Sequence, residues 1–320
     1  MARIAIIGPA SQDIYLSDNQ KLAPTNIGSE AILGKILVGS HTEIDKLSYK
    51  VGGSGLNAAV EFSRHGHEAI LLGNIAKDAA GNAVMNTCDA EGIDSSYLNF
   101  VPRTATSTEI ILLDSDSGNY TSLSAAGAAK SPNSIDVYDL ETIAPDWLFI
   151  TTLSGDFFTL NKIMKKAKEL GIKIMFCPGE KEIESPKKLI DLLKYVDIIA
   201  MNKKKAAEIV PGTVLSELLS HLGNYIKNVI ITDGQMGGIA TNGTESYRFG
   251  LYESLKIKDL NGAGVAFCSG FLAHLAAGKS FRTSLVYASA NSISVVSKIG
   301  GYTGALVGNE PLHPMPIQKI

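Results

Sequence analysis

Short apolar runs alternate with longer segments of helical periodicity along most of this chain. Runs of this length, closed by small or polar residues, are typical of strands buried on both faces of a parallel sheet. We predict such strands over residues 4–7, 69–72, 147–151, 172–177, 197–201 and 228–232. We predict helices over residues 78–91, 158–170 and 281–298, and one that ends near residue 65. This alternation indicates right-handed crossovers and an α/β fold with a mostly parallel central sheet flanked by helices.

Two glycine-rich stretches open predicted helices. Gly52-Gly53-Ser54-Gly55-Leu56-Asn57 lies near the N-terminus, and Asp259-Leu260-Asn261-Gly262-Ala263-Gly264-Val265 lies much later. Glycine lets the backbone turn tightly and approach a ligand closely, and the start of a helix attracts anions such as phosphate. Each stretch alone is equally consistent with a glycine-containing helix start that binds nothing.

Together, in this order and at this spacing, the two stretches resemble the paired signature of the PfkB, or ribokinase-like, carbohydrate and nucleoside kinases. The resemblance covers nearly the whole chain and implies a single domain over residues 1–320. The implied fold is a Rossmann-like three-layer ribokinase fold with a small β lid. We expect that lid to comprise residues 14–51, including a short β-type run at 36–38, and residues 107–124. The resemblance further implies that the lid covers the sugar and pairs two chains in a homodimer.

The resemblance also implies a role for each matching residue. Substrate hydroxyls would be bound by Asp13, Gly52, Gly53 and Asn57. Charge on the transferred phosphate would be stabilised by Gly262, Ala263 and Gly264. The nucleotide, ATP with Mg²⁺, would be bound by Asn202, Thr232, Gly234, Gly237, Asp259 and Asn291. No set of protein side chains is assigned to a metal.

Two positions depart from the pattern of the family. Val265 stands where the family carries its catalytic aspartate, and valine cannot take a proton from a hydroxyl. Lys205 stands where an Asn-x-x-Glu motif beginning at Asn202 would place a glutamate that organises magnesium. Lys205 removes a hard oxygen ligand, and it would instead contact phosphate as a point charge or simply lie on a solvated helix face. Each replacement is reachable by one base change, so both are also consistent with recent substitutions in a working kinase.

Composition narrows the remaining classes. The 320 residues carry a net charge of −3, which gives no support for binding nucleic acid or a membrane surface through bulk charge. No apolar run is long enough for a membrane span, and we expect a cytoplasmic protein. The scattered cysteines, Cys88, Cys177 and Cys268, are predicted to be buried thiols. A dinucleotide-binding dehydrogenase is disfavoured, because Gly8-Pro9-Ala10-Ser11 lacks the Gly-x-Gly-x-x-Gly turn.

Three hypotheses therefore remain open for function. The first is a sugar or nucleoside kinase by descent whose phosphoryl transfer is impaired or lost. The second is an active ATP-dependent kinase that uses another base, such as Asp259 or a group on the substrate. The third is a non-catalytic nucleotide- or sugar-binding protein, or an interaction module that pairs through its lid.

Overall fold

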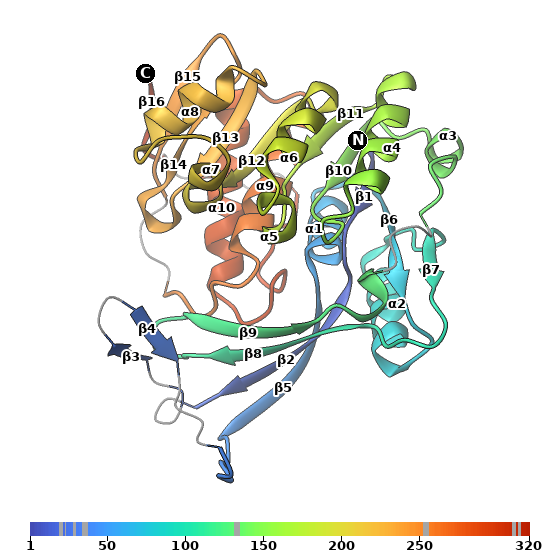
Figure 1. The fold of residues 1–320 in the computed structure, drawn as a ribbon, viewed down its shortest axis with the longest axis vertical. Coiled ribbons are helices and arrows are strands. Elements are labelled where there is room, and N and C mark those ends of the chain that lie inside the picture. Colours follow the sequence, from blue (N-terminus) through green and yellow to red (C-terminus); the bar gives the residue numbers. More distant parts are fainter. Residues whose placement is uncertain are drawn as a thin grey trace.

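The computed structural model describes residues 1–18, 22, 24–27, 30–33, 38–130, 135–251, 256–308, 312 and 315–320, without the side chains of 24–27 and 30–33. Its main element is a ten-stranded sheet with the order β16-β15-β14-β13-β12-β11-β10-β1-β6-β7 (Figure 1). The strands are β1 (Arg3–Ile7), β6 (Glu68–Ile75), β7 (Leu98–Phe100), β10 (Trp147–Ile150), β11 (Lys173–Phe176), β12 (Ile198–Asn202), β13 (Asn228–Thr232), β14 (Gly238–Thr241), β15 (Ser246–Phe249) and β16 (Ile317–Lys319).

The sheet is parallel from β7 to β13 and antiparallel from β13 to β16. Helices link the parallel strands, as the sequence predicts. They are α1 (Ser54–Arg64), α2 (Ala79–Glu91), α3 (Asp139–Ile143), α4 (Phe157–Glu169), α5 (Glu180–Ile183), α6 (Pro186–Leu192), α7 (Lys203–Ile209) and α8 (Leu215–Gly223). Two further helices, α9 (Ala263–Ala276) and α10 (Phe281–Val296), lie between β15 and β16 in the chain. The predicted α/β fold with a mostly parallel sheet flanked by helices is confirmed.

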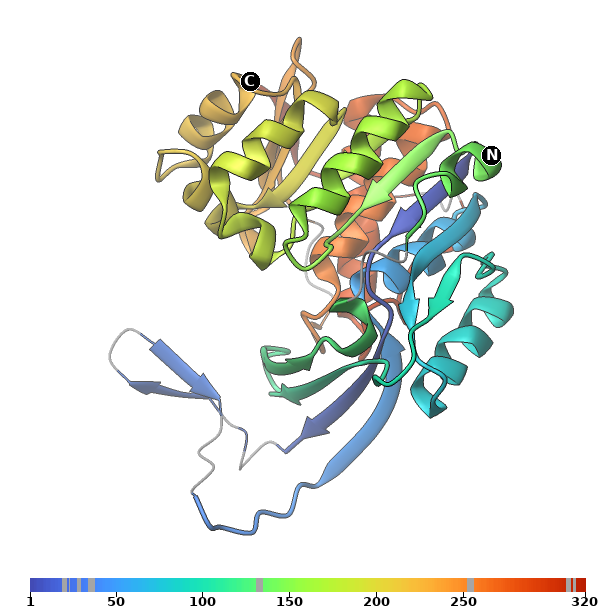
Figure 2. The same cartoon turned by 45° about the vertical axis from the view of Figure 1, so that its right-hand side comes forward.

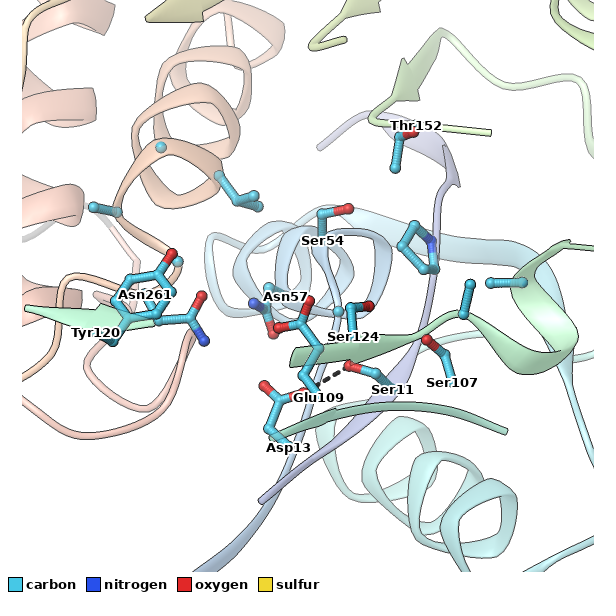
Figure 3. Close-up of a pocket in the computed structure, with 18 of the residues that line it drawn as sticks. Ser11, Asp13, Ser54, Asn57, Ser107, Glu109, Tyr120, Ser124, Thr152 and Asn261 are labelled. Carbon is cyan, nitrogen blue, oxygen red and sulfur yellow. Dashed lines mark hydrogen bonds between the residues drawn. The ribbon is translucent and has the colours of Figure 1, made fainter. Parts of the chain in front are cut away.

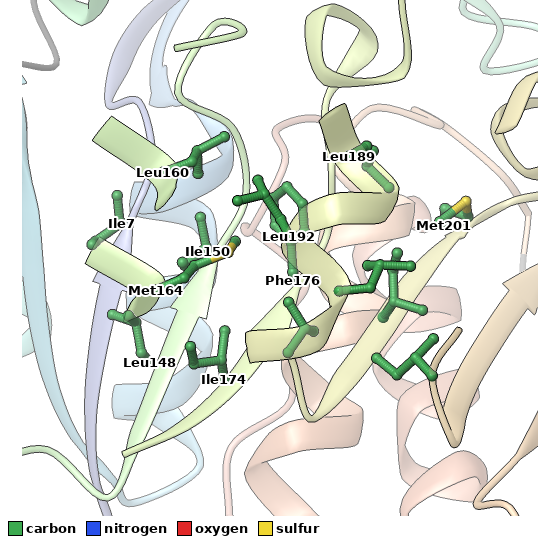
Figure 4. Packing of buried hydrophobic residues seen from close by; sticks show 14 of the residues in the cluster. Ile7, Leu148, Ile150, Leu160, Met164, Ile174, Phe176, Leu189, Leu192 and Met201 are labelled. Atoms are coloured by element: carbon green, nitrogen blue, oxygen red, sulfur yellow. The ribbon is translucent and has the colours of Figure 1, made fainter. Parts of the chain in front are cut away.

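Helices cover both faces of the main sheet and make three layers. Along β1, Ala5 and Ile7 pack into the cluster under α3 to α8, whereas Ile4 and Ile6 pack into the cluster under α1, α2, α9 and α10. This alternation follows from the two-residue period of a strand. Figure 4 shows Leu160 of α4 packed over the strands, in one of these two cores. Full burial of a side chain of this size contributes about 1.5–3 kcal/mol to folding.

A second, four-stranded sheet lies apart from the main sheet, at the bottom of Figure 1. Its order is β5-β2-β8-β9, and we call it the lid sheet. Its strands are β2 (Ser11–Ser17), β5 (Lys46–Gly52), β8 (Ser107–Leu113) and β9 (Tyr120–Ala125). It draws on both segments named in the sequence analysis, but it begins at Ser11, directly after the short connection from β1. Ser11 and Asp13 therefore belong to the sheet rather than to a turn.

A separate hairpin of β3 (Pro24–Ile27) and β4 (Glu30–Leu33) extends away from the rest of the chain in Figure 2. Residues 36 and 37 of the predicted β-type run lie outside the described residues. A tight turn through Asn242 and Gly243 joins β14 to β15 as an antiparallel hairpin. Within the described ranges, no helix combines the length and the apolar character that a membrane crossing requires.

Candidate functional site

Helix α9 begins in the later of the two glycine-rich stretches. Gly262 is its N-cap, with a φ of 85° that glycine adopts at little cost. A Cβ at Gly262 would clash with the backbone of Gly301, whereas one at Gly264 would meet no atom within 4 Å. The first N–H groups of a helix have no intrahelical partner, and the helix dipole makes this end positive. The start of α9 is therefore open to an anion at Gly264.

Asp259 holds the turn that precedes α9. Its side chain is fully buried, and its two oxygens accept hydrogen bonds from the N–H groups of Asn261 and Gly300, each at 2.9 Å. Burial raises the pKa of this carboxyl, while the two backbone donors lower it. Asp259 lines neither of the pockets described below. Asp259 therefore shapes the turn before α9, and the nucleotide contact implied for it in the sequence analysis stays a prediction.

A pocket of about 410 Å³ lies between the lid sheet and the start of α9 (Figure 3). We call it the lid pocket. Its described lining residues are Pro9, Ser11, Asp13, Gly53, Ser54, Asn57, Ser107, Glu109, Tyr120, Ser124, Ala126, Ala129, Thr152, Ser154, Leu260, Asn261, Gly262, Ala263, Gly264 and Val265. Hydroxyl, carboxylate and amide groups dominate this list, and it contains no lysine or arginine. A small molecule with many hydroxyl groups suits such a lining.

Asp13 lies on β2 and is 1% exposed. The hydroxyl of Ser11 donates to its Oδ1 at 2.7 Å. Burial, together with the nearby negative charges of Glu109 and Asp259, raises the pKa of Asp13 to about 7, although the Ser11 bond opposes this shift. A Cβ at Gly52, in the neighbouring strand β5, would clash with the Asp13 carboxylate. Gly52 thus leaves room for Asp13, and it does not itself line the pocket.

The earlier glycine-rich stretch brings Asn57 to the same pocket. Gly53 is the N-cap of α1, with a φ of 90°, and a Cβ there would overlap Pro9. This close approach lets α1 start beside the chain that leaves β1. Asn57, in the first turns of α1, is 4% exposed, and its buried Oδ1 has no hydrogen-bond partner. The structure therefore brings Asp13, Gly53 and Asn57 together at one cavity.

A second pocket of about 440 Å³ lies on the other side of the α9 start. We call it the apolar pocket, because hydrocarbon side chains form most of its wall. Its lining residues are Asn202, Thr232, Gly234, Gln235, Gly237, Phe249, Leu251, Ile257, Leu260, Ala263, Gly264, Phe267, Ser292, Ile293 and Val296. Four residues assigned to the nucleotide by resemblance are among them: Asn202, Thr232, Gly234 and Gly237. Leu260, Ala263 and Gly264 line both pockets, so the two cavities meet at the start of α9.

Lys205 lines neither pocket. Its ammonium group donates to the carbonyl oxygen of Pro178 at 3.0 Å and lies 3.3 Å from Oε1 of Glu180. The side chain is largely buried between these partners. Asn202 caps α7 by accepting a hydrogen bond from the Lys205 N–H at 2.9 Å. The ammonium therefore contacts the connection after β11 and the first residue of α5, and its side chain is not on a solvated face.

Asn291 lies in the core and is not among the described lining residues of either pocket. It is fully buried, and its amide donates to Glu61 and to the carbonyl of Ala266, both at 2.9 Å. Its Oδ1 accepts from the N–H of Leu306 at 3.0 Å. Asn291 joins α10 to α1 and α9 in the core, and the next residue, Ser292, faces the apolar pocket instead. Neighbouring residues of a helix point in directions about 100° apart, so Ser292 and Asn291 are on different faces of α10.

Val265 lies in the first turn of α9 and lines the lid pocket, half-buried against the core. A carboxylate at this position would face both the start of the helix and the pocket. The isopropyl group presents only hydrocarbon there. The site thus has a donor-rich helix start beside a polar cavity, without a proton acceptor at the position between them.

Glu109 and Tyr120 are pocket residues that the sequence analysis did not name. Glu109 lies on β8 and burial raises its pKa. Tyr120 begins β9 and lines the same pocket, although it is partly exposed. A signal for Glu109 was present, because it is the one charged residue in the run Thr108-Glu109-Ile110-Ile111-Leu112-Leu113. The sequence alone does not show that β8 pairs with β2, so it could not place Glu109 beside Asp13.

The residues of the two pockets fit a nucleotide and a polyol better than they fit a protein-bound metal ion. The apolar pocket has an open glycine cradle at one end, and none of its described lining residues is a carboxylate. In the part of the chain that the structure describes, no group of three or more histidine, cysteine, aspartate or glutamate residues could hold a metal ion. Magnesium would therefore depend on phosphate oxygens and water for its ligands.

A parallel α/β sheet, a separate lid sheet and two pockets meeting at a helix start define a ribokinase-type fold. The chain belongs to the pfkB family of carbohydrate kinases, whose family model matches residues 26–306. It is similar to the ribokinase of Lactococcus lactis subsp. lactis, with 25% identity over 305 residues that cover 95% of this chain and 94% of that protein.

Solved structures show the same fold. The ribokinase of Arabidopsis thaliana, complexed with ribose and ATP, aligns with a TM-score of 0.79 and 20% identity over 96% of each chain. The nucleoside kinase of Methanocaldococcus jannaschii aligns with a TM-score of 0.76 and 21% identity over 96% of this chain and 95% of that one. These findings confirm the family and the fold expected from the two glycine-rich stretches.

Proposed function

We propose that this chain binds ATP in the apolar pocket and a polyhydroxylated small molecule in the lid pocket. The observation that carries this proposal is that Leu260, Ala263 and Gly264 line both pockets. The hydrocarbon side chains of the apolar pocket, among them Phe249 and Phe267, would pack against a nucleobase. The start of α9 would bind the terminal phosphates. Two proteins of the same fold, a ribokinase complexed with ribose and ATP and a nucleoside kinase, support the same two ligand classes.

Phosphoryl transfer would follow from this arrangement. The acceptor hydroxyl oxygen forms a bond to the γ-phosphorus, the bond from that phosphorus to the β-phosphate oxygen breaks, and ADP leaves. Amides at the start of α9 would stabilise charge on the moving phosphoryl group. The hydroxyl proton must go to an acceptor, and Val265 offers none. We infer that transfer by this chain is slow, because general-base assistance is typically worth about 10²–10⁴-fold in rate.

Asp259 does not replace the missing base in this proposal. Both of its oxygens bind backbone N–H groups, and it lines neither pocket. A second candidate function, favoured by Val265 and by the engagement of Lys205 with Pro178, is a nucleotide- and sugar-binding protein that does not catalyse transfer. Pairing through the lid sheet remains a prediction from the resemblance.

Calorimetric titration with ATP, with and without magnesium, tests the proposal directly. Binding in either condition, competed by ADP, supports it, and the absence of binding in both overturns it. Release of ADP is then measured with sugars and nucleosides as acceptors. Turnover that depends on one acceptor supports the kinase. Binding of both ligands without turnover supports the non-catalytic candidate.

A further inference from the structure

Three side chains of the lid pocket present oxygen atoms to one part of the cavity. Asp13 on β2 and Glu109 on β8 lie opposite each other in the parallel register of the lid sheet, so their side chains share a face. Asn57 enters from α1, and Figure 3 shows the three side chains grouped at the centre of the pocket. Each offers a hydrogen-bond acceptor, and ionised carboxylates offer nothing else.

Few of the described residues donate hydrogen bonds to these acceptors. Ser11 supplies one, to Oδ1 of Asp13. Oδ1 of Asn57 is buried and has no partner. Buried polar atoms normally have hydrogen bonds, and leaving one unmade costs free energy. An unpartnered buried oxygen in the wall of a cavity indicates a ligand that donates to it.

The charge of this region is also one-sided. Asp13 and Glu109 line the pocket, and no described lining residue is a lysine or arginine. Lys50 of β5 is paired with Asp13 in the antiparallel register, so its side chain starts on the same face of the lid sheet. Its Cδ lies near Gly300, it does not line the pocket, and no ion pair joins it to Asp13. The buried Asp259 adds further negative potential near Asp13. A phosphorylated or carboxylated substrate would be repelled here, and a cation would be attracted.

We propose that the molecule bound in the lid pocket carries a protonated amino group, which Asp13, Glu109 and Asn57 hold together. A hydroxyl group donates one hydrogen bond, whereas an ammonium group donates three and neutralises the paired carboxylates. The substrate class is therefore an amino sugar or an amino polyol. This inference rests on the proposed function, since it identifies the second ligand of the same site.

The test uses the unaltered chain and matched ligand pairs. D-glucosamine, D-galactosamine and D-mannosamine are titrated calorimetrically beside D-glucose, D-galactose and D-mannose. We expect at least one amine to bind about tenfold or more tightly than its hydroxyl partner, since charge-assisted hydrogen bonds exceed neutral ones by about this factor. The N-acetyl derivative of that amine should lose the advantage, because its amide carries no charge.

Substitution assigns the effect to the pocket. Glu109→Gln keeps the shape of the side chain and removes its charge. We expect it to weaken amine binding by about tenfold while the neutral partner changes by less than about threefold. Glu208→Gln, at an exposed position of α7, is the matched control and should change neither. Thermal unfolding of each variant checks that the fold is retained.

Several results would overturn the proposal. If the neutral sugars bound as tightly as the matching amines, or if none of the amines bound, the proposal of an ammonium ligand would be wrong. If Glu109→Gln kept the preference for the amine, the ammonium group would not be bound by Asp13 and Glu109. Binding of magnesium or calcium alone, lost in Glu109→Gln, would make the carboxylates a metal site instead. The ATP titration is separate, so the proposed function can stand when the amine proposal fails.

Discussion

Gly262 and Gly264 are two residues apart at the start of α9, yet a side chain at each would meet opposite surroundings. A Cβ at Gly262 would clash with the backbone of Gly301 and would sit at a φ of 85°. A Cβ at Gly264 would meet no atom within 4 Å, at a point that lines both pockets. The fold requires Gly262 to be a glycine, whereas Gly264 leaves open space where the two pockets meet.

Gly264→Ala therefore separates stability from binding. Replacing a helical glycine by alanine stabilises a protein by up to about 1 kcal/mol, and nothing in the structure opposes the added methyl group. The same methyl group fills the place proposed for the phosphates. We expect urea unfolding to shift to equal or higher urea concentration, and calorimetry to show ATP affinity reduced by about tenfold or more.

Gly262→Ala is the contrasting variant. It introduces a side chain at a positive φ and against Gly301, so we expect a loss of about 1–3 kcal/mol in the free energy of unfolding. If Gly264→Ala bound ATP as tightly as the unaltered chain, the phosphates would not pass over Gly264. The proposed position of the nucleotide would then be wrong.

Val265→Asp should restore a proton acceptor between the two pockets. We expect turnover with ATP, magnesium and the best acceptor to rise by about 10²-fold or more, in line with the usual worth of a general base. Val265→Asn is the matched control, since it has nearly the same shape and polarity but cannot take the proton. Release of ADP measures both variants. Equal rates for the two would mean that the missing base does not limit this chain.

Lys205→Met tests whether the ammonium group acts on the nucleotide. The structure binds it to the carbonyl of Pro178 and to Glu180, and it lines neither pocket. We therefore expect ATP affinity to change by less than about threefold, while the free energy of unfolding falls by about 1 kcal/mol through the lost hydrogen bond. Calorimetry and urea unfolding measure the two quantities. A tenfold loss of ATP affinity would instead indicate that Lys205 reaches the phosphates.

The carboxyl group of Glu61 is buried between α1, α9 and α10, and Glu61→Gln tests whether it is protonated in the folded chain. Ser269 and Asn291 donate to its Oε2, while Oε1 has no partner, and burial raises its pKa to about 8 from 4.5. The folded chain therefore keeps a proton that the unfolded chain releases above pH 4.5. Stability must fall as pH rises from about 4.5 to about 8, by up to about 1.4 kcal/mol per pH unit.

A glutamine keeps both hydrogen bonds and has no charge to gain. We expect the unaltered chain and Glu61→Gln to have similar urea midpoints at pH 5, and the variant to be more stable at pH 9. Glu208→Gln, at an exposed position, should show no such divergence. Parallel pH dependence of the unaltered chain and Glu61→Gln would show that Glu61 is ionised in the folded state.

The two helix starts that the sequence predicts depend on local backbone chemistry. Gly53 and Gly262 both adopt a positive φ at a helix N-cap, and glycine clusters before an amphipathic segment indicate such turns. The strands of the main sheet were predicted because apolar runs buried on both faces are recognisable without their neighbours. β16 was missed, since Ile317–Lys319 is short and largely exposed and becomes a strand only by pairing with β15.

The amino-acid sequence by itself determined the family, the α/β architecture and the absence of a base at position 265, because these follow from residue types and their spacing. Only the tertiary structure decided which side chains use their polar groups for the fold. Asp259, Lys205 and Asn291 each bind protein groups that are distant in sequence or in another element. Glu109 joins Asp13 only because β8 lies beside β2. A motif specifies a residue type, whereas packing decides which partner it faces.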